Sequence, residues 1–595
     1  MPNIVLFLLA AAPTATDARA FVDRANRELR AAIIDNTRIG FVNQTYINDD
    51  TEILSAQAEA HLLEVQSRLI AEAVKYKDVP NAPADVKRAI RLMSVSNEVP
   101  PPSDQKAREE LATLSSELQG MFGKGKACVT VSKKDGSKTE CLGQDGAEKL
   151  MASSRDEAQL RQLWVEWHKI GAPMRDKFTR EVALENQGAK ALGFNDVGEV
   201  WRSGYDMDPA AFSADMDRLW AQLKPFYEQL HCYVRTKLSQ KYGKDKVPLH
   251  GAMPAHVLGN LWAQEWNNVY PLVEPYPLQK MLDVTSALVA NKYDSHKMVK
   301  QAESFFVSLG FDPLPPSFWS RSMFTRPRDR EVICHASAWD FFDGEVRVKM
   351  CLQPTEEDLA VAHHELGHDF YFEQYRKQPT LFAAGANDGF HEAVGDTITL
   401  SMTPDYFKRI GLFATTPVKN EQAQINELMQ SALAKVSFLP FGLLIDRWRW
   451  EVFSGAVGKD RYNQRWWELS HQYQGIDPPL ARSEADFDPG AKYHVAASTP
   501  YMRYFIARVL QFQLHRGLCK AAGFTGPLSE CSIYGNQVAG EKLRAMLALG
   551  ASKPWPEALA AATGESSLDA TAILDYYQPL TEWLKKQNAS QTCGW

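Results

Sequence analysis

PTEEDLAVAHHELGHDFYFEQY, residues 354–375, is the segment that decides the fold of this chain. It begins as a helix should, because Thr355 can cap the first turn and three acidic residues follow, where they favour the positive end of the helix dipole. His364 and His368 are four positions apart, so their imidazoles share one face and can bind a single ion. Glu365 points to one side, where a carboxylate can take a proton from a water on the metal. The segment therefore predicts a catalytic zinc site on a helix.

A zinc site of this kind needs a third protein ligand from another segment. The sequence NDGFHEAVGD at 387–396 offers a second capped helix, on which Glu392 and Asp396 are four apart and share a face. We expect Glu392 to complete a His/His/Glu site, and Asp396 to accept the outer N–H of a ligating histidine. His391 is the alternative ligand, but it faces elsewhere. A surface or capping acid is the alternative interpretation of Asp396.

Helical spacing of apolar residues dominates the rest of the chain, so the predicted fold is mainly α with a few short antiparallel strands. Strand alternation appears on both sides of Asp135-Gly136 and Asp343-Gly344, which predicts two hairpins. The second hairpin leads directly into the zinc-binding helix. Because no internal repeat and no long linker divides the sequence, we expect one zinc peptidase domain of two interleaved lobes over residues 17–595.

The cysteines indicate the compartment. Three pairs are close in sequence, and two of these pairs flank the predicted hairpin turns, which can bring the sulfur atoms together. Disulfides persist in oxidising compartments, so we expect a periplasmic or secreted protein; six unpaired buried thiols are the alternative. An apolar run at 4–12 fits the core of a secretory signal but lacks a preceding Lys or Arg, so residues 1–16 are a signal remnant or a first helix. The expected pairs are Cys128–Cys141, Cys334–Cys351 and Cys519–Cys531, which leaves Cys232 and Cys593 over.

Composition excludes two other classes of protein. The chain has 595 residues, of which 45% are hydrophobic and 23% charged, with a net charge of −7. No run of Lys and Arg with interleaved aromatic residues occurs, so no nucleic-acid partner is expected. No stretch reaches the roughly 18 to 20 apolar residues that span a bilayer, so we expect no membrane anchor. Without a coiled-coil heptad, a monomer is expected.

Five strings, two of them within the segments already quoted, resemble the angiotensin-converting enzyme family, also called peptidyl-dipeptidase A. They are CHASAWDF (334–341), VAHHELGHDFYFEQY (361–375), GFHEAVGD (389–396), LIDRWRWEVFSG (444–455) and DFDPGAKYHVAASTPYMRYF (486–505). The likeness extends from about residue 40 to the end and suggests a soluble, bacterial-type member. It implies a gluzincin-type helical ellipsoid with a deep internal channel, one zinc ion per chain, and chloride. It also implies release of carboxy-terminal dipeptides from oligopeptides with a free carboxyl end.

The resemblance assigns roles to single residues. Glu365 would act as general base and acid, while His494 and Tyr504 would stabilise the oxyanion. Residues implied to hold the substrate chain or its free carboxylate are His335, Ala336, Gln264, Lys492 and Tyr501. Related carboxypeptidases that remove one residue carry an Arg at the position of Gln264. Because an amide reaches less far than a guanidinium fork, Gln264 favours release of a dipeptide.

Local chemistry supports part of this assignment. Ser498 or Thr499 can cap a helix with Pro500 at its first position, so Tyr501 and Tyr504 would share a face. A phenol can donate to developing negative charge, and an ammonium can pair with a terminal carboxylate. Ordinary amphipathic packing is the alternative interpretation of the two tyrosines.

The chloride sites depart from the family pattern. Tyr205 and Arg503 are present for one site. At the other, Trp466 is kept, but His168 and Ser470 stand where two arginines are implied. We therefore expect a simpler chloride response than in members with two sites, and a biphasic activation curve would contradict this.

Two other functions remain open on the sequence. A zinc carboxypeptidase or oligopeptidase of the same superfamily would use a similar metal site, and product size separates it from a dipeptidase. A non-catalytic peptide-binding protein would have no need of Glu365.

Overall fold

The computed structural model describes residues 12–133, 136–279, 281–415 and 420–595. The fold is mainly helical, which confirms the predicted class. In chain order the helices are α1 (Ala15–Thr45), α2 (Asp49–Ala73), α3 (Ala84–Val95), α4 (Gln105–Gly123), α5 (Gln144–Ser153), α6 (Glu157–His168), α7 (Arg175–Ala191), α8 (Val197–Ser203), α9 (Pro209–Tyr242), α10 (Tyr270–Val273), α11 (Val284–Ala290), α12 (Ser295–Ser308), α13 (Pro316–Arg321), α14 (Glu356–Tyr375), α15 (Asp388–Leu400), α16 (Pro404–Arg409), α17 (Glu421–Lys435), α18 (Phe438–Phe453), α19 (Tyr462–Leu469), α20 (Tyr493–Ala496), α21 (Met502–Ala521), α22 (Gln537–Leu547), α23 (Trp555–Thr563), α24 (Thr571–Tyr576) and α25 (Gln578–Gln587).

Strands form three two-stranded sheets among the described residues. The strands are β1 (Ala127–Lys133), β2 (Gly136–Leu142), β3 (Met253–Pro254), β4 (Ser337–Asp340), β5 (Val346–Lys349) and β6 (Ile476–Asp477). Both predicted hairpins are present as the antiparallel pairs β1–β2 and β4–β5. Asp135, in the first predicted turn, lies outside the described residues. In the second turn Gly344 has a φ of 93°, which a glycine adopts without strain.

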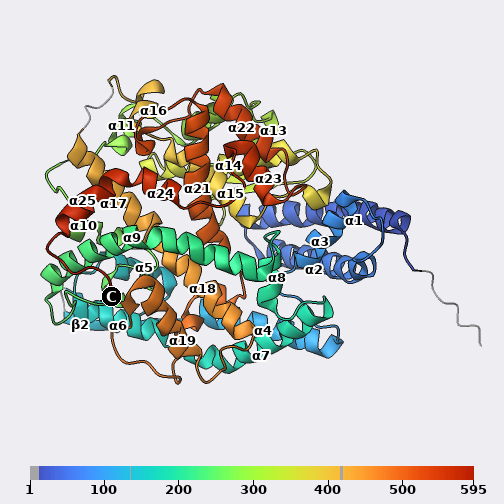
Figure 1. Cartoon of the computed structure of the whole chain (residues 1–595), viewed down its shortest axis with the longest axis horizontal. Helices are drawn as coiled ribbons and strands as arrows, with labels where there is room; N and C mark the ends of the chain where they lie inside the picture. The colour runs from blue at the N-terminus through green and yellow to red at the C-terminus, as the bar shows by residue number, and fades with distance from the viewer. Residues whose placement is uncertain (1–11, 134–135, 280, 416–419) are drawn as a thin grey trace, which may run out of the picture.

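Helix α9 crosses the middle of the molecule in the view of Figure 1. On one side of it lie α4, α6, α7, α18 and α19, and on the other lie α14, α15 and α21 to α25. Each side therefore combines segments that are far apart in the sequence. One large core of buried apolar residues extends through both sides, whereas α1 to α3 pack around a smaller core of their own.

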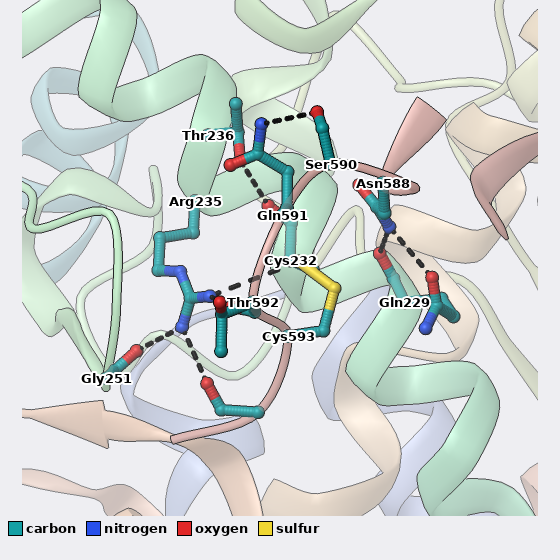
Figure 2. The surroundings of a disulfide bond; sticks show 11 residues. Gln229, Cys232, Arg235, Thr236, Gly251, Asn588, Ser590, Gln591, Thr592 and Cys593 are labelled. Atoms are coloured by element: carbon teal, nitrogen blue, oxygen red, sulfur yellow. Dashed lines mark hydrogen bonds between the residues drawn. A yellow bond between two sulfur atoms is a disulfide. The ribbon is translucent and has the colours of Figure 1, made fainter. Parts of the chain in front are cut away.

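Four disulfides tie the chain together, three of them at the expected pairs. The fourth joins Cys232 on α9 to Cys593, across 361 residues of sequence. Beside this bond the guanidinium of Arg235 donates to the backbone oxygen of Thr592 (Figure 2) and also to that of Gly594. The two cysteines that the sequence leaves over thus fix the carboxyl end to the central helix.

Among the described residues, one stretch, Glu421–Phe453, is long and apolar enough to cross a membrane by length and composition. It comprises α17 and α18, and 78% of its most apolar window is buried inside the fold. Such burial is typical of a core helix, and α18 contributes many of the residues of the large core.

Candidate metal centre and substrate cavity

Three side chains from two helices converge on one point. The Nε2 atoms of His364 and His368, both on α14, are 3.2 Å apart. The Oε2 atom of Glu392, on α15, lies 3.5 Å from His364 Nε2. The three candidate ligand atoms all lie within 4.8 Å of one another, which is close enough for one ion to contact all three.

The two helices approach closely because each carries a glycine at the crossing. A Cβ added to Gly367 would lie 2.6 Å from the Cα of Gly395. A Cβ added to Gly395 would lie 2.6 Å from the backbone oxygen of His364. Both distances are shorter than van der Waals contact, so these two glycines allow Glu392 to reach the histidine pair.

Asp396 holds the outer nitrogen of the first histidine. Its Oδ1 lies 3.3 Å from His364 Nδ1. Burial opposes ionisation of this carboxyl group, but Lys435 and Arg508, together with His364, hold the pKa of Asp396 well below its usual range. An ionised carboxylate accepts the Nδ1–H of His364 and leaves the lone pair on Nε2.

His391 is the outer partner of the second histidine, His368, as Asp396 is of His364. The sequence does not reveal this role of His391. Its Nδ1 lies 3.3 Å from His368 Nδ1, and its Nε2 lies 3.2 Å from the phenol oxygen of Tyr375. If His368 Nδ1 donates to His391 Nδ1, then His391 Nε2–H is left to donate to Tyr375. His391 is therefore an outer partner of the site, and the candidate ligand oxygen comes from Glu392.

This donor set fits zinc. With both Nδ1 atoms donating outward, the two Nε2 lone pairs and the Glu392 carboxylate face one another, and such a group of electron-rich atoms is unfavourable without a cation between them. Two imidazoles and one carboxylate are also the ligands of many catalytic zinc sites. The residues that would hold the ion are His364, His368 and Glu392.

Glu365 is positioned beside this cluster on α14 and is 8% exposed. Burial raises the pKa of its carboxyl group, and the ammonium group of Lys349 is among the neighbours that oppose the shift. A carboxyl group with a raised pKa can both accept and return a proton near neutral pH. The ammonium group of Lys349 is fixed by the backbone oxygens of Ile333 and His335, so the β4–β5 hairpin shapes the surroundings of Glu365.

A cavity of about 290 Å³ connects two of the candidate metal ligands to a second set of predicted residues, whereas His368 and Glu365 are not among the residues that line it. The predicted residues among its lining are His364, Glu392, Asp396, Gln264, Lys492, His494, Tyr501 and Tyr504. His335 and Ala336 do not line it; they lie just before β4, where His335 Nδ1 is 2.9 Å from the backbone oxygen of Ala336. The sequence also missed Glu265, Arg508 and Phe438, which line the same cavity.

Lys492 and Gln264 form a pair inside this cavity. The Nζ atom of Lys492 donates to Oε1 of Gln264 at 2.6 Å and lies 4.1 Å above the ring of Trp262. Burial lowers the pKa of Lys492 to about 7, and the carboxylates of Glu265 and Glu148 oppose this shift. A buried ammonium with one neutral partner has donors left for an anionic ligand.

The aromatic residues of the cavity gather around His494. Ring centroids are 4.6 Å apart for His494 and Tyr501, and 4.9 Å apart for Tyr501 and Tyr504. The Nε2 atom of His494 lies 3.4 Å from the phenol oxygen of Tyr504. Burial lowers the pKa of His494 to about 3, with Lys492 acting in the same direction, so this imidazole is neutral. Its buried Nδ1 has no hydrogen-bond partner.

The start of α21 corrects the predicted cap. The helix begins at Met502, and neither Ser498 nor Thr499 caps it. Instead, the carboxylate of Asp446 on α18 accepts the backbone N–H groups of Tyr501 and Met502 at 2.8 and 2.6 Å. A carboxylate from a distant helix satisfies these donors, so no local cap is needed. The sequence signal for this role is a charged Asp446 within an apolar helical run.

The same buried pair on α18 also positions the imidazole. Arg449 is bound to Asp446 and donates to the backbone oxygen of His494 at 2.8 Å. Both charged residues are 1% exposed. One ion pair thus orients the segment from His494 to Tyr504.

Tyr205 and Arg503, the predicted chloride pair, lie together, but a carboxylate is already between them. The phenol of Tyr205 donates to Oδ2 of Asp388 at 3.2 Å, and Nε of Arg503 lies 3.1 Å from the same oxygen. In the region of Trp466, burial lowers the pKa of His168 to about 4, and the hydroxyl of Ser470 donates to the backbone oxygen of Ile476. Neither His168 nor Ser470 therefore supplies a positive charge there.

Residues 12–595 match the peptidase M2 family, described as angiotensin-converting enzyme. The chain is 41% identical over 593 residues to the angiotensin-converting enzyme of Bos taurus, which covers 97% of this chain and 44% of that protein. Identity to the Rattus norvegicus protein is 43% over 518 residues, or 86% of this chain and 38% of that protein. For the Haematobia irritans exigua protein it is 36% over 586 residues, or 97% of this chain and 95% of that protein.

The chain thus spans less than half the length of these two mammalian relatives and nearly all of the insect one. The three relatives are animal proteins, so they give no support to the expectation of a bacterial-type member.

Proposed function

The chain belongs to the angiotensin-converting enzyme family, and we propose that it is a zinc-dependent peptidyl-dipeptidase that releases carboxy-terminal dipeptides from oligopeptides. The observation that carries this proposal is one cavity lined both by two of the candidate metal ligands, His364 and Glu392, and by the Lys492–Gln264 pair. An enzyme that removes a set number of residues from the carboxyl end needs a group that binds the terminal carboxylate at a fixed place. That group and the reactive centre must lie in the same cavity. Lys492 is the fixed point in this proposal, and Gln264 orients it.

When bound by His364, His368 and Glu392, zinc would supply a Lewis acid that acidifies water and polarises a carbonyl group. Lys492 and the phenol of Tyr501 hold the terminal carboxylate of the peptide. Glu365 takes a proton from the attacking water and passes it to the nitrogen of the leaving dipeptide. Tyr504 and His494 donate to the carbonyl oxygen as negative charge develops on it.

We further propose that the protein acts as a monomer in an oxidising compartment, either secreted or periplasmic. Four disulfides and no free cysteine support this location, because the cytosol keeps thiols reduced. Chloride is left out of the proposal at Tyr205 and Arg503, because the carboxylate of Asp388 already accepts from Tyr205 and forms an ion pair with Arg503.

The proposal is tested by mass spectrometry of the products from a decapeptide and from an amino-blocked tripeptide. We expect two-residue units to leave from the carboxyl end, and a zinc chelator to stop their release. An amidated decapeptide is the matched control and should be cut far more slowly, because it offers Lys492 no carboxylate. Loss of single residues would favour the carboxypeptidase alternative, internal cuts an oligopeptidase, and no cleavage a peptide-binding protein.

A pH dependence follows from the buried ammonium. Its pKa of about 7 in the free protein lies below that of an ordinary lysine, so Lys492 loses its charge as the pH rises through about 7. We therefore expect kcat/KM, which reports the free enzyme, to fall on the alkaline side of this value. The Lys492→Arg variant should lose this limb, because a guanidinium stays charged.

Glu265→Gln provides the second half of the test. The carboxylate of Glu265 raises the pKa of Lys492, so its loss should move the alkaline limb to lower pH. Both variants are measured by kcat/KM between pH 5.5 and about 9 at constant ionic strength. If the alkaline limb were the same in the unchanged protein, Lys492→Arg and Glu265→Gln, the pH dependence would not arise from Lys492.

A further inference from the structure

The carboxylate of Asp388 lies between Tyr205 and Arg503, the two residues that the sequence predicts to bind chloride. Its Oδ2 atom accepts a hydrogen bond from the phenol of Tyr205 at 3.2 Å and forms an ion pair with Nε of Arg503 at 3.1 Å. One oxygen between a phenol and a guanidinium is the arrangement that a bound monatomic anion would have. Here the anion is part of the chain.

The single positive charge of Arg503 already faces two carboxylates. Besides Asp388, its guanidinium pairs with the carboxylate of Glu98. A chloride ion at this place would add a third negative charge next to one positive charge. It would also compete with a tethered carboxylate, which does not lose translational freedom on binding and cannot be diluted away.

This ion pair links two helices that carry predicted site residues. Asp388 is the first residue of α15, four positions before Glu392. Arg503 lies in the first turn of α21, next to Tyr504. The two helices touch at this end, because a Cβ added to Gly389 would lie 3.3 Å from the backbone oxygen of Arg503.

We propose that Asp388 is a built-in anion that replaces chloride at the Tyr205–Arg503 pair and holds α15 and α21 in register without any dissolved ion. Asp388 acts here as a positioning residue, since its side chain works through Arg503. The proposal goes beyond the proposed function, because anion binding at Arg503 can be measured without a substrate. The sequence predicts a simpler chloride response than in members with two sites, whereas this proposal predicts no chloride response at the Tyr205–Arg503 pair.

The test compares sodium chloride with sodium gluconate at constant ionic strength, using the full chain with its metal. The first readout is the Tm, which rises when an anion binds the folded state, and the second is kcat/KM. For the unchanged protein we expect neither quantity to depend on chloride. This measurement alone can overturn the proposal, because a saturable rise in Tm or kcat/KM with chloride would show that Asp388 does not fill the site.

Asp388→Ala removes the carboxylate and opens its space. In gluconate we expect its kcat/KM to be about tenfold lower, within the range of roughly 5- to 150-fold that is usual for coupling between sites. Chloride, and likewise formate, should restore most of this loss and raise the Tm with saturation. A variant that folds but responds to neither anion would contradict the proposal.

Two further variants separate this site from a general effect of salt. Asp388→Asn removes the charge but keeps an amide in the same space, so it should be impaired without recovering in chloride. Asp388→Ala combined with Arg503→Gln lacks the cation and should show no anion response. A response in either variant as large as that of Asp388→Ala would assign the effect to salt in general and overturn the proposal.

Discussion

Replacing Glu365 with Gln is expected to lower kcat by about 10³-fold, within the range of roughly 10² to 10⁴ that general acid–base groups contribute. The amide keeps the shape of the side chain but cannot accept a proton from the attacking water or return one to the leaving amine. Burial raises the pKa of the native carboxyl group, which suits it to both steps. Steady-state kinetics on a dipeptide-releasing substrate measure the loss.

The metal content separates this effect from damage to the zinc site. Glu365 is not one of the three converging ligands, so the variant should still hold one zinc ion per chain, as measured by elemental analysis. Glu357→Gln is the matched control, because it changes an exposed glutamate near the start of the same helix. If Glu365→Gln kept more than about a tenth of the activity, the proton transfer would have to be assigned to another residue.

The helices that carry the predicted metal ligands could be read from the sequence because their signals are local. Thr355 accepts from the backbone N–H of Asp358, and Asn387 accepts from that of Gly389, so each cap lies within three residues of its partner. Spacing of four then places His364 with His368, and Glu392 with Asp396, on single faces. The β4–β5 hairpin was equally local, since its turn follows from Asp343-Gly344.

The remaining features depend on residues that meet only in the folded chain. Asp446 caps α21 from 55 residues away, and no pattern within the α21 segment predicts it. Cys232 forms a disulfide with Cys593 across 361 residues of sequence. Cysteine spacing alone cannot predict such a pair when nearer pairs exist. The sequence shows Asp388 only as an acidic residue at the start of a predicted helix. Its place between Tyr205 and Arg503 follows from the packing of α15 on α21.

Replacing Tyr504 with Phe is expected to lower kcat by about 10²- to 10³-fold, the usual effect of removing one donor to an oxyanion, with little change in KM. The phenol lies 3.4 Å from His494 Nε2, in the cavity that His364 and Glu392 also line. Burial raises the pKa of Tyr504, so the hydroxyl keeps its proton at neutral pH and can donate to developing negative charge. The free peptide carries no such charge on the carbonyl oxygen, so its affinity should hardly change.

Tyr501→Phe is the control that makes the experiment specific. This phenol comes from the same short segment, and its ring is packed 4.9 Å from that of Tyr504, but in the proposed mechanism it binds the terminal carboxylate. That interaction is present before and during the reaction, so its loss should raise KM and leave kcat nearly unchanged. Measuring both constants for both variants distinguishes the two roles, because removing a packing contact would affect the two tyrosines alike. A fall in kcat for Tyr501→Phe together with a rise in KM for Tyr504→Phe would reverse the assignment and place the reacting carbonyl nearer to Lys492.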